Sequence, residues 1–217
     1  MLRTETIERT VLILLKTLMQ DEKLKHFNLV GGTALALFIG HRKSIDLDLF
    51  SLHTFDTVAL EKYLYNTYNF ENQYPEKKTD IILIGNIQKV KVDFVWDDSR
   101  LINPLCFYDD IRICSIHDIA AMKLKAILQN GTRLKDFVDV AFLSVKMSLK
   151  NMLDAFEIKY PSTGKLLAAK ALTYFDDIDF STKIELINGE YKWKEIEKRL
   201  KEMIKYPDKK FLNYPLI

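Results

Sequence analysis

Hydrophobic residues in the first part of the chain are spaced as in a strand, a tight turn and a helix. Residues 27–30 are apolar except for Asn28, Gly31 and Gly32 follow them, and Thr33 opens an apolar run. Glycines let the backbone turn sharply and approach a ligand closely, and the free N–H groups at the start of a helix favour an anion. The pattern therefore predicts a strand, a turn suited to phosphate, and a helix.

Apolar and acidic residues alternate from residue 45 to residue 50. Alternate side chains of a strand share a face, so this spacing places Asp46 and Asp48 together. Paired carboxylates repel each other and are best tolerated around a divalent cation, and such oxygen ligands suit magnesium that substrate phosphates also hold. An exposed sheet edge is the structural alternative. The apolar members, which the pattern directs into the core, are Ile45, Leu47 and Leu49.

A second acidic strand is predicted farther along the chain. Residues 89–95 alternate strictly, with Asp93 on the polar face, and residues 80–84 predict a partner strand joined through a hairpin turn at Gly85-Asn86. Phosphoryl-type transfer with two metal ions usually needs a third carboxylate that also draws the proton from the attacking hydroxyl, and Asp93 fits that role. The alternative is that Asp93 simply pairs with a neighbouring lysine across the sheet.

A lysine interrupts the apolar stripe of a predicted helix that follows a capping-box-like sequence at Ser115. Lys123 falls inside this stripe, so its ammonium must either snorkel to solvent or reach a buried or ligand anion. Lys125 lies about 200° away around the helix and is predicted to be solvated. The stripe consists of Ile116, Ile119 and Ile127.

The next predicted helix carries two aspartates outside its main apolar stripe. Asp136 and Asp139 lie near a second apolar patch, which predicts that this edge is half-buried or covered by a neighbouring element. Acidic groups there could orient Lys123 or Arg133, or bind a nucleotide directly. The main stripe consists of Leu134, Phe137, Val138, Ala141, Phe142 and Val145.

Four of these segments together resemble a known family. Gly-Gly-Thr-Ala-Leu at 31–35 and Arg-Lys-Ser-Ile-Asp-Leu-Asp-Leu-Phe at 42–50 resemble the first two motifs of the AbiEii/AbiGii toxin family, within the polymerase-β-like nucleotidyltransferase superfamily. Residues 122–127 and 133–140 resemble its third and fourth motifs. The resemblance covers roughly residues 25–145. Many members of the family have an arginine near the position of Asn130, and this chain lacks it. No residue of this chain is therefore assigned to the phosphate contact that this arginine would make.

The resemblance implies an α+β fold and a nucleotide-transfer site. We expect a polymerase-β-like nucleotidyltransferase core with a mixed sheet over residues 1–114 and a helical C-terminal domain over residues 115–217 that closes the cleft. The implied substrate is a nucleoside triphosphate and the implied cofactor is Mg²⁺. The implied metal ligands are Asp46, Asp48 and Asp93. The implied catalytic residues are these three aspartates together with Lys123 and Asp136. Lys123 would hold the triphosphate, and Asp136 is the aspartate of the fourth motif. The implied nucleotide contacts are Gly31, Gly32, Thr33, Arg42, Ser44 and Lys123, and Asp139 matches a structural or supporting position.

Composition narrows the choice of acceptor only slightly. The chain has 217 residues, 48% of them hydrophobic and 29% charged, with a net charge of +2, so any RNA site must be a local patch. A lysine-rich segment near the C-terminus is a candidate, although a solvated amphipathic helix explains it equally well. Its basic residues include Lys192, Lys194, Lys198, Arg199 and Lys201.

The expected function is transfer of a nucleoside monophosphate from a triphosphate to an acceptor hydroxyl. Family resemblance favours RNA, most plausibly the 3′ end of transfer RNA, with the protein acting as the toxin of a toxin-antitoxin pair and an antitoxin protein as a further partner. A small-molecule nucleotidyltransferase and a noncatalytic nucleotide-binding protein stay open as alternatives. Cys106 and Cys114 show no zinc spacing and, with no signal-like start, indicate a reducing cytoplasm. The apolar run at residues 11–18 is too short to span a membrane.

Overall fold

A seven-stranded mixed sheet forms the centre of the N-terminal half in the computed structural model, which describes residues 1–76 and 79–217. The strand order is β3-β4-β5-β2-β1-β7-β6. Strands β2 and β5 are parallel, as are β1 and β7, and the other neighbours are antiparallel. The strands are β1 (Phe27–Val30), β2 (Leu47–Ser51), β3 (Glu71–Asn72), β4 (Ile82–Ile87), β5 (Val90–Trp96), β6 (Cys106–Tyr108) and β7 (Ile111–Ile113).

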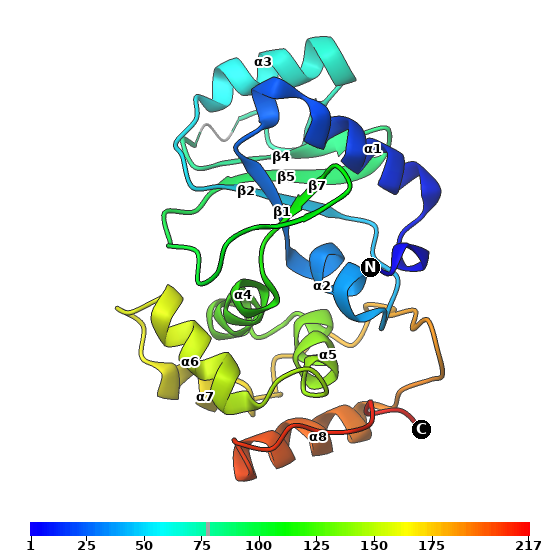
Figure 1. Ribbon diagram of the computed structural model, residues 1–217, viewed down its shortest axis with the longest axis vertical. Helices are drawn as coiled ribbons and strands as arrows, with labels where there is room; N and C mark the ends of the chain where they lie inside the picture. Colours follow the sequence, from blue (N-terminus) through cyan, green and yellow to red (C-terminus); the bar gives the residue numbers. More distant parts are fainter. Residues whose placement is uncertain (77–78) are drawn as a thin grey trace.

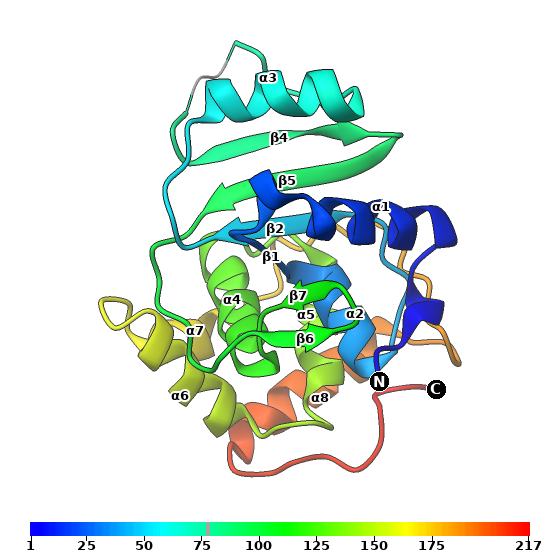
Figure 2. The same cartoon turned by 45° about the horizontal axis from the view of Figure 1, so that its top comes forward.

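Helices cover both faces of this sheet. Figure 1 shows α1 and α3 on one face and α2 with α4 on the other, while α5 to α8 extend away from the sheet beyond α4. Figure 2 shows the strands more openly, with α3 beyond β4. The helices are α1 (Arg9–Gln20), α2 (Gly31–Ile39), α3 (Thr57–Tyr68), α4 (Ile116–Gln129), α5 (Leu134–Leu143), α6 (Leu149–Lys159), α7 (Lys165–Ala171) and α8 (Trp193–Lys205), with short 3₁₀ turns at Thr4–Thr6 and Glu22–Leu24.

Local sequence signals set several helix ends. The Ser115 side chain accepts a hydrogen bond from the Asp118 backbone N–H, which begins α4 as the capping-box pattern predicts. Gly40 ends α2 in the left-handed conformation that glycine adopts without strain. One cluster of buried apolar residues then runs from the sheet through α2 into α4 and α5. Among the described residues, no helix is both long and apolar enough to cross a membrane.

Two details of the predicted strands are wrong. Strand β2 begins only at Leu47, and Ile45 is 55% exposed rather than in the core, because the segment before the strand is not part of the sheet ladder. Strand β4 runs through Gly85 and Asn86 to Ile87, and the hairpin turn lies at Gln88 and Lys89, both with positive φ. The predicted alternation of Leu47 and Leu49 into the core and of Asp93 outward is confirmed.

The sheet continues beyond the loop at Asn103-Pro104. Strands β6 and β7 form a hairpin after this loop, and β7 pairs with β1 through Leu29 and Ile113. The predicted change to helical structure therefore comes at Ile116, after the hairpin. The boundary between two domains near residue 114 stays a prediction.

An extended segment of the C-terminal part pairs with the loop after α2. Arg42 and Leu186 form an isolated antiparallel bridge. The Lys43 N–H donates to the Glu185 carbonyl at 2.8 Å, and the Ile187 N–H donates to the His41 carbonyl at 3.0 Å. Residues 185–187, which we call the strap, therefore hold the backbone of residues 41–43.

Candidate active site

The parallel pairing of β2 and β5 brings two acidic residues side by side. Asp48 and Asp93 are direct partners in the register of these strands, so their side chains share one face of the sheet. Burial, and then the negative charges of Asp93 and Asp46, raise the pKa of Asp48 above its ordinary value of 3.8, although Lys123 and Lys91 oppose this. The three aspartates predicted from the alternating strands therefore contribute to one electrostatic site.

Asp93 has one oxygen engaged and one free. Lys91 Nζ lies 2.6 Å from Asp93 Oδ2, so the predicted lysine pairing exists, but along the same strand rather than across the sheet. Asp93 Oδ1 is buried and has no hydrogen-bond partner. A buried unpaired carboxylate oxygen beside a second carboxylate of raised pKa fits a divalent cation. Within residues 1–76 and 79–217, however, no three His, Cys, Asp or Glu side chains form a group that could hold a metal ion by themselves.

The two glycines of the turn make room for protein side chains as well as for a ligand. Gly31 has φ of +72°, and a Cβ there would lie 1.9 Å from Asp48 Oδ2. A Cβ on Gly32 would lie 2.5 Å from a terminal nitrogen of Arg42. A larger residue at Gly31 would displace Asp48, and one at Gly32 would displace Arg42. The two glycines therefore leave free the space that these side chains occupy. The first turn of α2, which has no side-chain cap, thus begins directly beside the Asp48 carboxylate.

Thr33 and Ser44 connect this turn to the acidic segment. Thr33 is buried, and its hydroxyl oxygen lies 2.8 Å from Ser44 Oγ. The same Thr33 hydroxyl donates to the backbone carbonyl of Asp46. These contacts hold Asp46 at the start of β2 and give Thr33 and Ser44 a positioning role in addition to the predicted nucleotide contact.

Lys123 forms buried ion pairs and does not snorkel to solvent. It is 5% exposed, and its Nζ lies 2.6 Å from Asp136 Oδ1 and 2.7 Å from Asp139 Oδ2. Burial alone would lower the pKa of Lys123, but the negative charges of Asp136 and Asp139 raise it above 10.5. The helix edge that carries the two aspartates is therefore covered by neighbouring elements, which is one of the two predicted possibilities, and the lysine stays charged within it.

The Asp139 carboxylate contacts three side chains that lie far from it in the sequence, His41, Arg42 and Lys123. Its carboxylate accepts from Arg42 Nε at 2.7 Å and from a terminal nitrogen of Arg42 at 2.9 Å, and it lies 2.8 Å from His41 Nε2. Burial alone would raise the pKa of Asp139, but Arg42, Lys123 and the hydrogen bonds hold it well below 3.8. Asp139 therefore anchors both the predicted phosphate lysine and the predicted nucleotide contact Arg42.

Two cavities meet at the centre of this arrangement and share Asp48, Lys123 and Arg133. The first, the inner cavity, has a volume of about 190 Å³, and the second, the acidic cavity, about 340 Å³. Together they reach the size range of small-molecule sites. Every residue predicted for the site lines one or both of them: Gly31, Gly32, Thr33, Arg42, Ser44, Asp46, Asp48, Asp93, Lys123 and Asp136.

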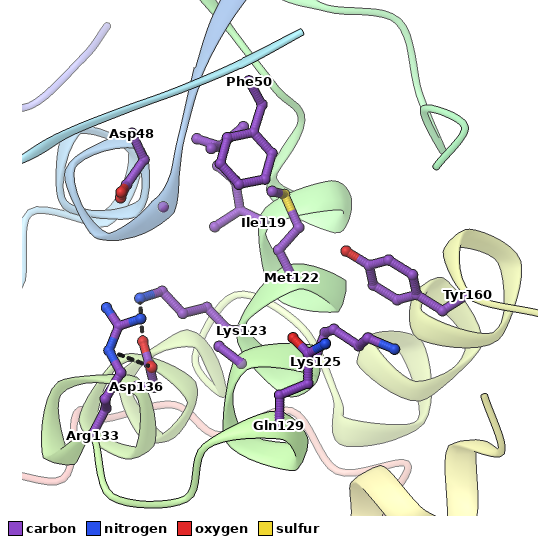
Figure 3. Close-up of a pocket in the computed structure, with 13 residues that line it drawn as sticks. Asp48, Phe50, Ile119, Met122, Lys123, Lys125, Gln129, Arg133, Asp136 and Tyr160 are labelled. Carbon is purple, nitrogen blue, oxygen red and sulfur yellow. Dashed lines mark hydrogen bonds and ion pairs between the residues drawn. The ribbon is translucent and has the colours of Figure 1, made fainter. Parts of the chain in front are cut away.

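The inner cavity has an apolar half that the sequence did not predict. Figure 3 shows Asp48, Lys123, Arg133 and Asp136 along one side of this cavity and Phe50 among the side chains of the other. Phe50 follows Asp48 by two residues on the same strand face, so the alternation already contained this signal. Further apolar and aromatic side chains that line the inner cavity are Val30, Ile119, Met122, Ala126 and Tyr160, and the polar side chains of Lys125 and Gln129 also line it.

Lys125 differs from expectation, whereas the basic C-terminal segment forms the amphipathic helix that the sequence offered as the alternative to an RNA site. Lys125 is half-buried, not solvated: its Nζ lies 3.2 Å from Thr163 Oγ1 and 5.1 Å from the centre of the Tyr160 ring. The basic helix α8 packs on α5 and contributes no residue to either cavity. Figure 1 places α8 on the side of the helices away from the sheet. The Lys201 ammonium there pairs with Glu197 at 2.5 Å.

Comparisons with known proteins agree with this geometry. Residues 13–211 match the family described as nucleotidyl transferase AbiEii toxin, type IV toxin-antitoxin system. An uncharacterized protein of Aquifex aeolicus (strain VF5) is 32% identical over 184 residues, which covers 82% of this chain and 86% of that protein.

Solved structures support the fold. A crystal structure from H. pylori, described only provisionally as a nucleotidyltransferase, superposes with a TM-score of 0.54 at 18% identity over 93% of this chain and 96% of that chain. Another, JHP933 from Helicobacter pylori, has a TM-score of 0.49 at 17% identity over 93% of both chains. The expected α+β fold with a polymerase-β-like core and mixed sheet is therefore confirmed. The chain belongs to the AbiEii nucleotidyl transferase toxin family.

Proposed function

We propose that this protein transfers a nucleoside monophosphate from a nucleoside triphosphate to an acceptor hydroxyl. The observation that carries the proposal is the convergence of Asp48 and Asp93 with Lys123 around two joined cavities. Carboxylates and a buried ammonium that face the same space are the groups that phosphoryl-type transfer needs, because the chemistry depends on positioning and on stabilisation of developing charge.

The triphosphate lies between the first turn of α2 and Lys123. Asp48 and Asp93, with Asp46 beside them, would hold Mg²⁺, which would supply charge neutralisation of the phosphates. Lys123 neutralises the triphosphate, and Asp136 orients the lysine through its 2.6 Å contact. Arg133 supplies the cationic contact left unassigned near Asn130, because it lines both cavities and its Nε lies 3.3 Å from Asp136 Oδ2.

The reaction makes one bond and breaks one. The acceptor oxygen bonds to the α-phosphorus as the bond from that phosphorus to the bridging oxygen of the β-phosphate breaks. Pyrophosphate leaves, and the hydroxyl proton goes to the Asp93 carboxylate. Asp93 suits this role because its carboxylate lines the acidic cavity together with Asp46 and Asp48.

The acceptor is RNA, most plausibly the 3′ end of transfer RNA, and the protein acts as a toxin that a cognate antitoxin counters. Family membership carries this part of the proposal. Lys91, Arg133 and Lys135 line the acidic cavity and are the cations nearest to the incoming strand. The basic face of α8 is not needed for this step.

The test is incubation of the purified protein with magnesium, total RNA and each labelled nucleoside triphosphate in turn. We expect label in RNA, loss of labelling in the Asp48→Asn variant, and retention in Asp80→Asn, an exposed aspartate outside the site. Label that enters a cationic drug but never RNA would favour the small-molecule alternative. The absence of any magnesium-dependent triphosphate binding would favour a noncatalytic protein.

A further inference from the structure

The apolar half of the inner cavity has no role in the phosphate chemistry. We infer that it is the nucleobase subsite, in which Phe50, Met122 and Tyr160 contact the base and Gln129 binds its polar edge. This inference rests on the proposed function, because it assigns the other end of the same triphosphate.

Strand and helix periodicity explain why the two halves adjoin. Phe50 stands two residues after Asp48 on β2, so the carboxylate and the ring project from the same face. On α4, Met122 and Gln129 lie two turns apart on the face that lines the cavity, with Lys123 beside Met122. The charged groups therefore lie at one end of the cavity and the apolar groups at the other.

A nucleoside triphosphate likewise has a charged end and a largely apolar end. Its triphosphate is anionic, while its base is a flat heteroaromatic ring with hydrogen-bonding groups only at its edge. The faces of such rings gain stability against aromatic and thioether side chains. Figure 3 shows the Phe50 ring and the Met122 sulfur adjacent to each other, with the Tyr160 hydroxyl directed toward the same space.

Gln129 is the residue suited to the edge of the base. Its side chain is exposed, its amide points toward the cavity in Figure 3, and no hydrogen bond from the described part of the chain engages it. An amide carries both a donor and an acceptor, so it can match the paired groups on a base edge. Lys125 instead supports Tyr160, since its ammonium lies between the Thr163 hydroxyl and the tyrosine ring.

Substitution of Gln129 separates base recognition from phosphate recognition. In Gln129→Leu, which keeps the size of the side chain, the ratio of kcat/KM between the best and the worst of the four nucleoside triphosphates should shrink about 10-fold. Binding of inorganic tripolyphosphate with magnesium should not change, because Lys123 and the carboxylates are intact. Gln73→Leu, an exposed glutamine distant from both cavities, is the matched control.

Tyr160 gives a second measurement that does not depend on turnover. Tyr160→Ala should weaken binding of the preferred nucleoside triphosphate about 10-fold in calorimetry, while Tyr160→Phe, which keeps the ring, should change it less than about 3-fold. Equal weakening of tripolyphosphate and nucleotide, or an unchanged selectivity in Gln129→Leu, would overturn the base subsite while leaving the transferase intact. A wild-type protein that binds no triphosphate would overturn the proposed function itself.

Discussion

The buried carboxylate Asp139 gives the most direct quantitative test of the structure. It is fully buried and neutralises Arg42 and Lys123, which are themselves buried. Replacement by asparagine keeps the shape and one acceptor oxygen but removes the negative charge. Among the described residues that form ion pairs with these two cations, Asp136 is then the carboxylate left to compensate them.

The expected loss of stability follows from the cost of an uncompensated buried charge. Removal of one partner of a buried ion pair costs about 3–5 kcal/mol, and the retained oxygen places Asp139→Asn near the lower end, at about 3 kcal/mol. For a chain of this size each kcal/mol lowers Tm by about 2–4 °C, so we expect a decrease of about 6–12 °C. The free energy of unfolding is measured by urea titration and Tm by calorimetry.

Asp154→Asn is the control for this measurement. Asp154 forms an exposed pair with Lys150 at 3.1 Å, and loss of such a pair changes the free energy of unfolding by less than about 1 kcal/mol. If Asp139→Asn also costs less than about 1 kcal/mol, Arg42 and Lys123 are not held as buried cations by this carboxylate, and the account of the site electrostatics is wrong.

Three further perturbations test neighbouring parts of the site. Gly31→Ala should destroy transfer and cost about 1–2 kcal/mol of stability, because its Cβ would overlap Asp48 and its φ is positive, whereas Gly164→Ala, with open space around it, should leave activity unchanged. Asp48→Asn should abolish transfer yet keep or raise the midpoint of urea unfolding, because burial and like charges already disfavour the ionised Asp48 carboxylate. A clearly lower midpoint would contradict the raised pKa of Asp48. Burial lowers the pKa of His41 below 6.5 and outweighs the contact with Asp139, which would raise it. As pH decreases from about 6.5, His41 is therefore protonated in the unfolded chain before it is protonated in the folded protein, and the free energy of unfolding should fall. His41→Gln should flatten that decrease, and an unchanged pH profile would show that His41 does not contribute to it.

Periodicity predicted the strands of the site because one face of each is buried. A shift of one residue would have exposed Leu47 and Leu49, so the alternation fixed which face carries Asp48 and Asp93. It did not fix where β2 begins. The hydrogen bond from Thr33 to the Asp46 carbonyl holds the preceding segment outside the ladder, which leaves Ile45 exposed, and this contact arises from tertiary structure.

The hairpin shows how a local signal can mislead. Gly85-Asn86 has the composition of a tight turn, yet Gly85 lies within β4. A Cβ at Gly85 would lie 2.3 Å from the Phe70 ring and 2.4 Å from the Glu71 carbonyl, so close packing requires the glycine. The turn itself uses Gln88 and Lys89, which adopt positive φ without being glycine.

The sequence offered Asp136 and Asp139 as groups that could orient Lys123, but it gave no sign of the side chains that come from more distant elements. The stripe on α4 showed that Lys123 had to meet an anion or snorkel, and the structure identifies Asp136 and Asp139 as the anions. Tyr160 had no detectable signal, because it lies at the end of α6 and has no periodic relation to the strands or to α4. The apolar side of the inner cavity therefore emerged only from the three-dimensional arrangement.

The strap imposes an order on the assembly of the site during synthesis. The backbone of residues 41–43 pairs with residues 185–187, which are separated from it by most of the chain. A ribosome releases these two segments at widely different times, and such a long loop closes only after both have emerged. The loop that carries Arg42 therefore acquires its final support only after residues 185–187 have emerged. An interrupted chain would contain the acidic strands without the fully supported loop, so premature termination would release fragments with an incomplete site.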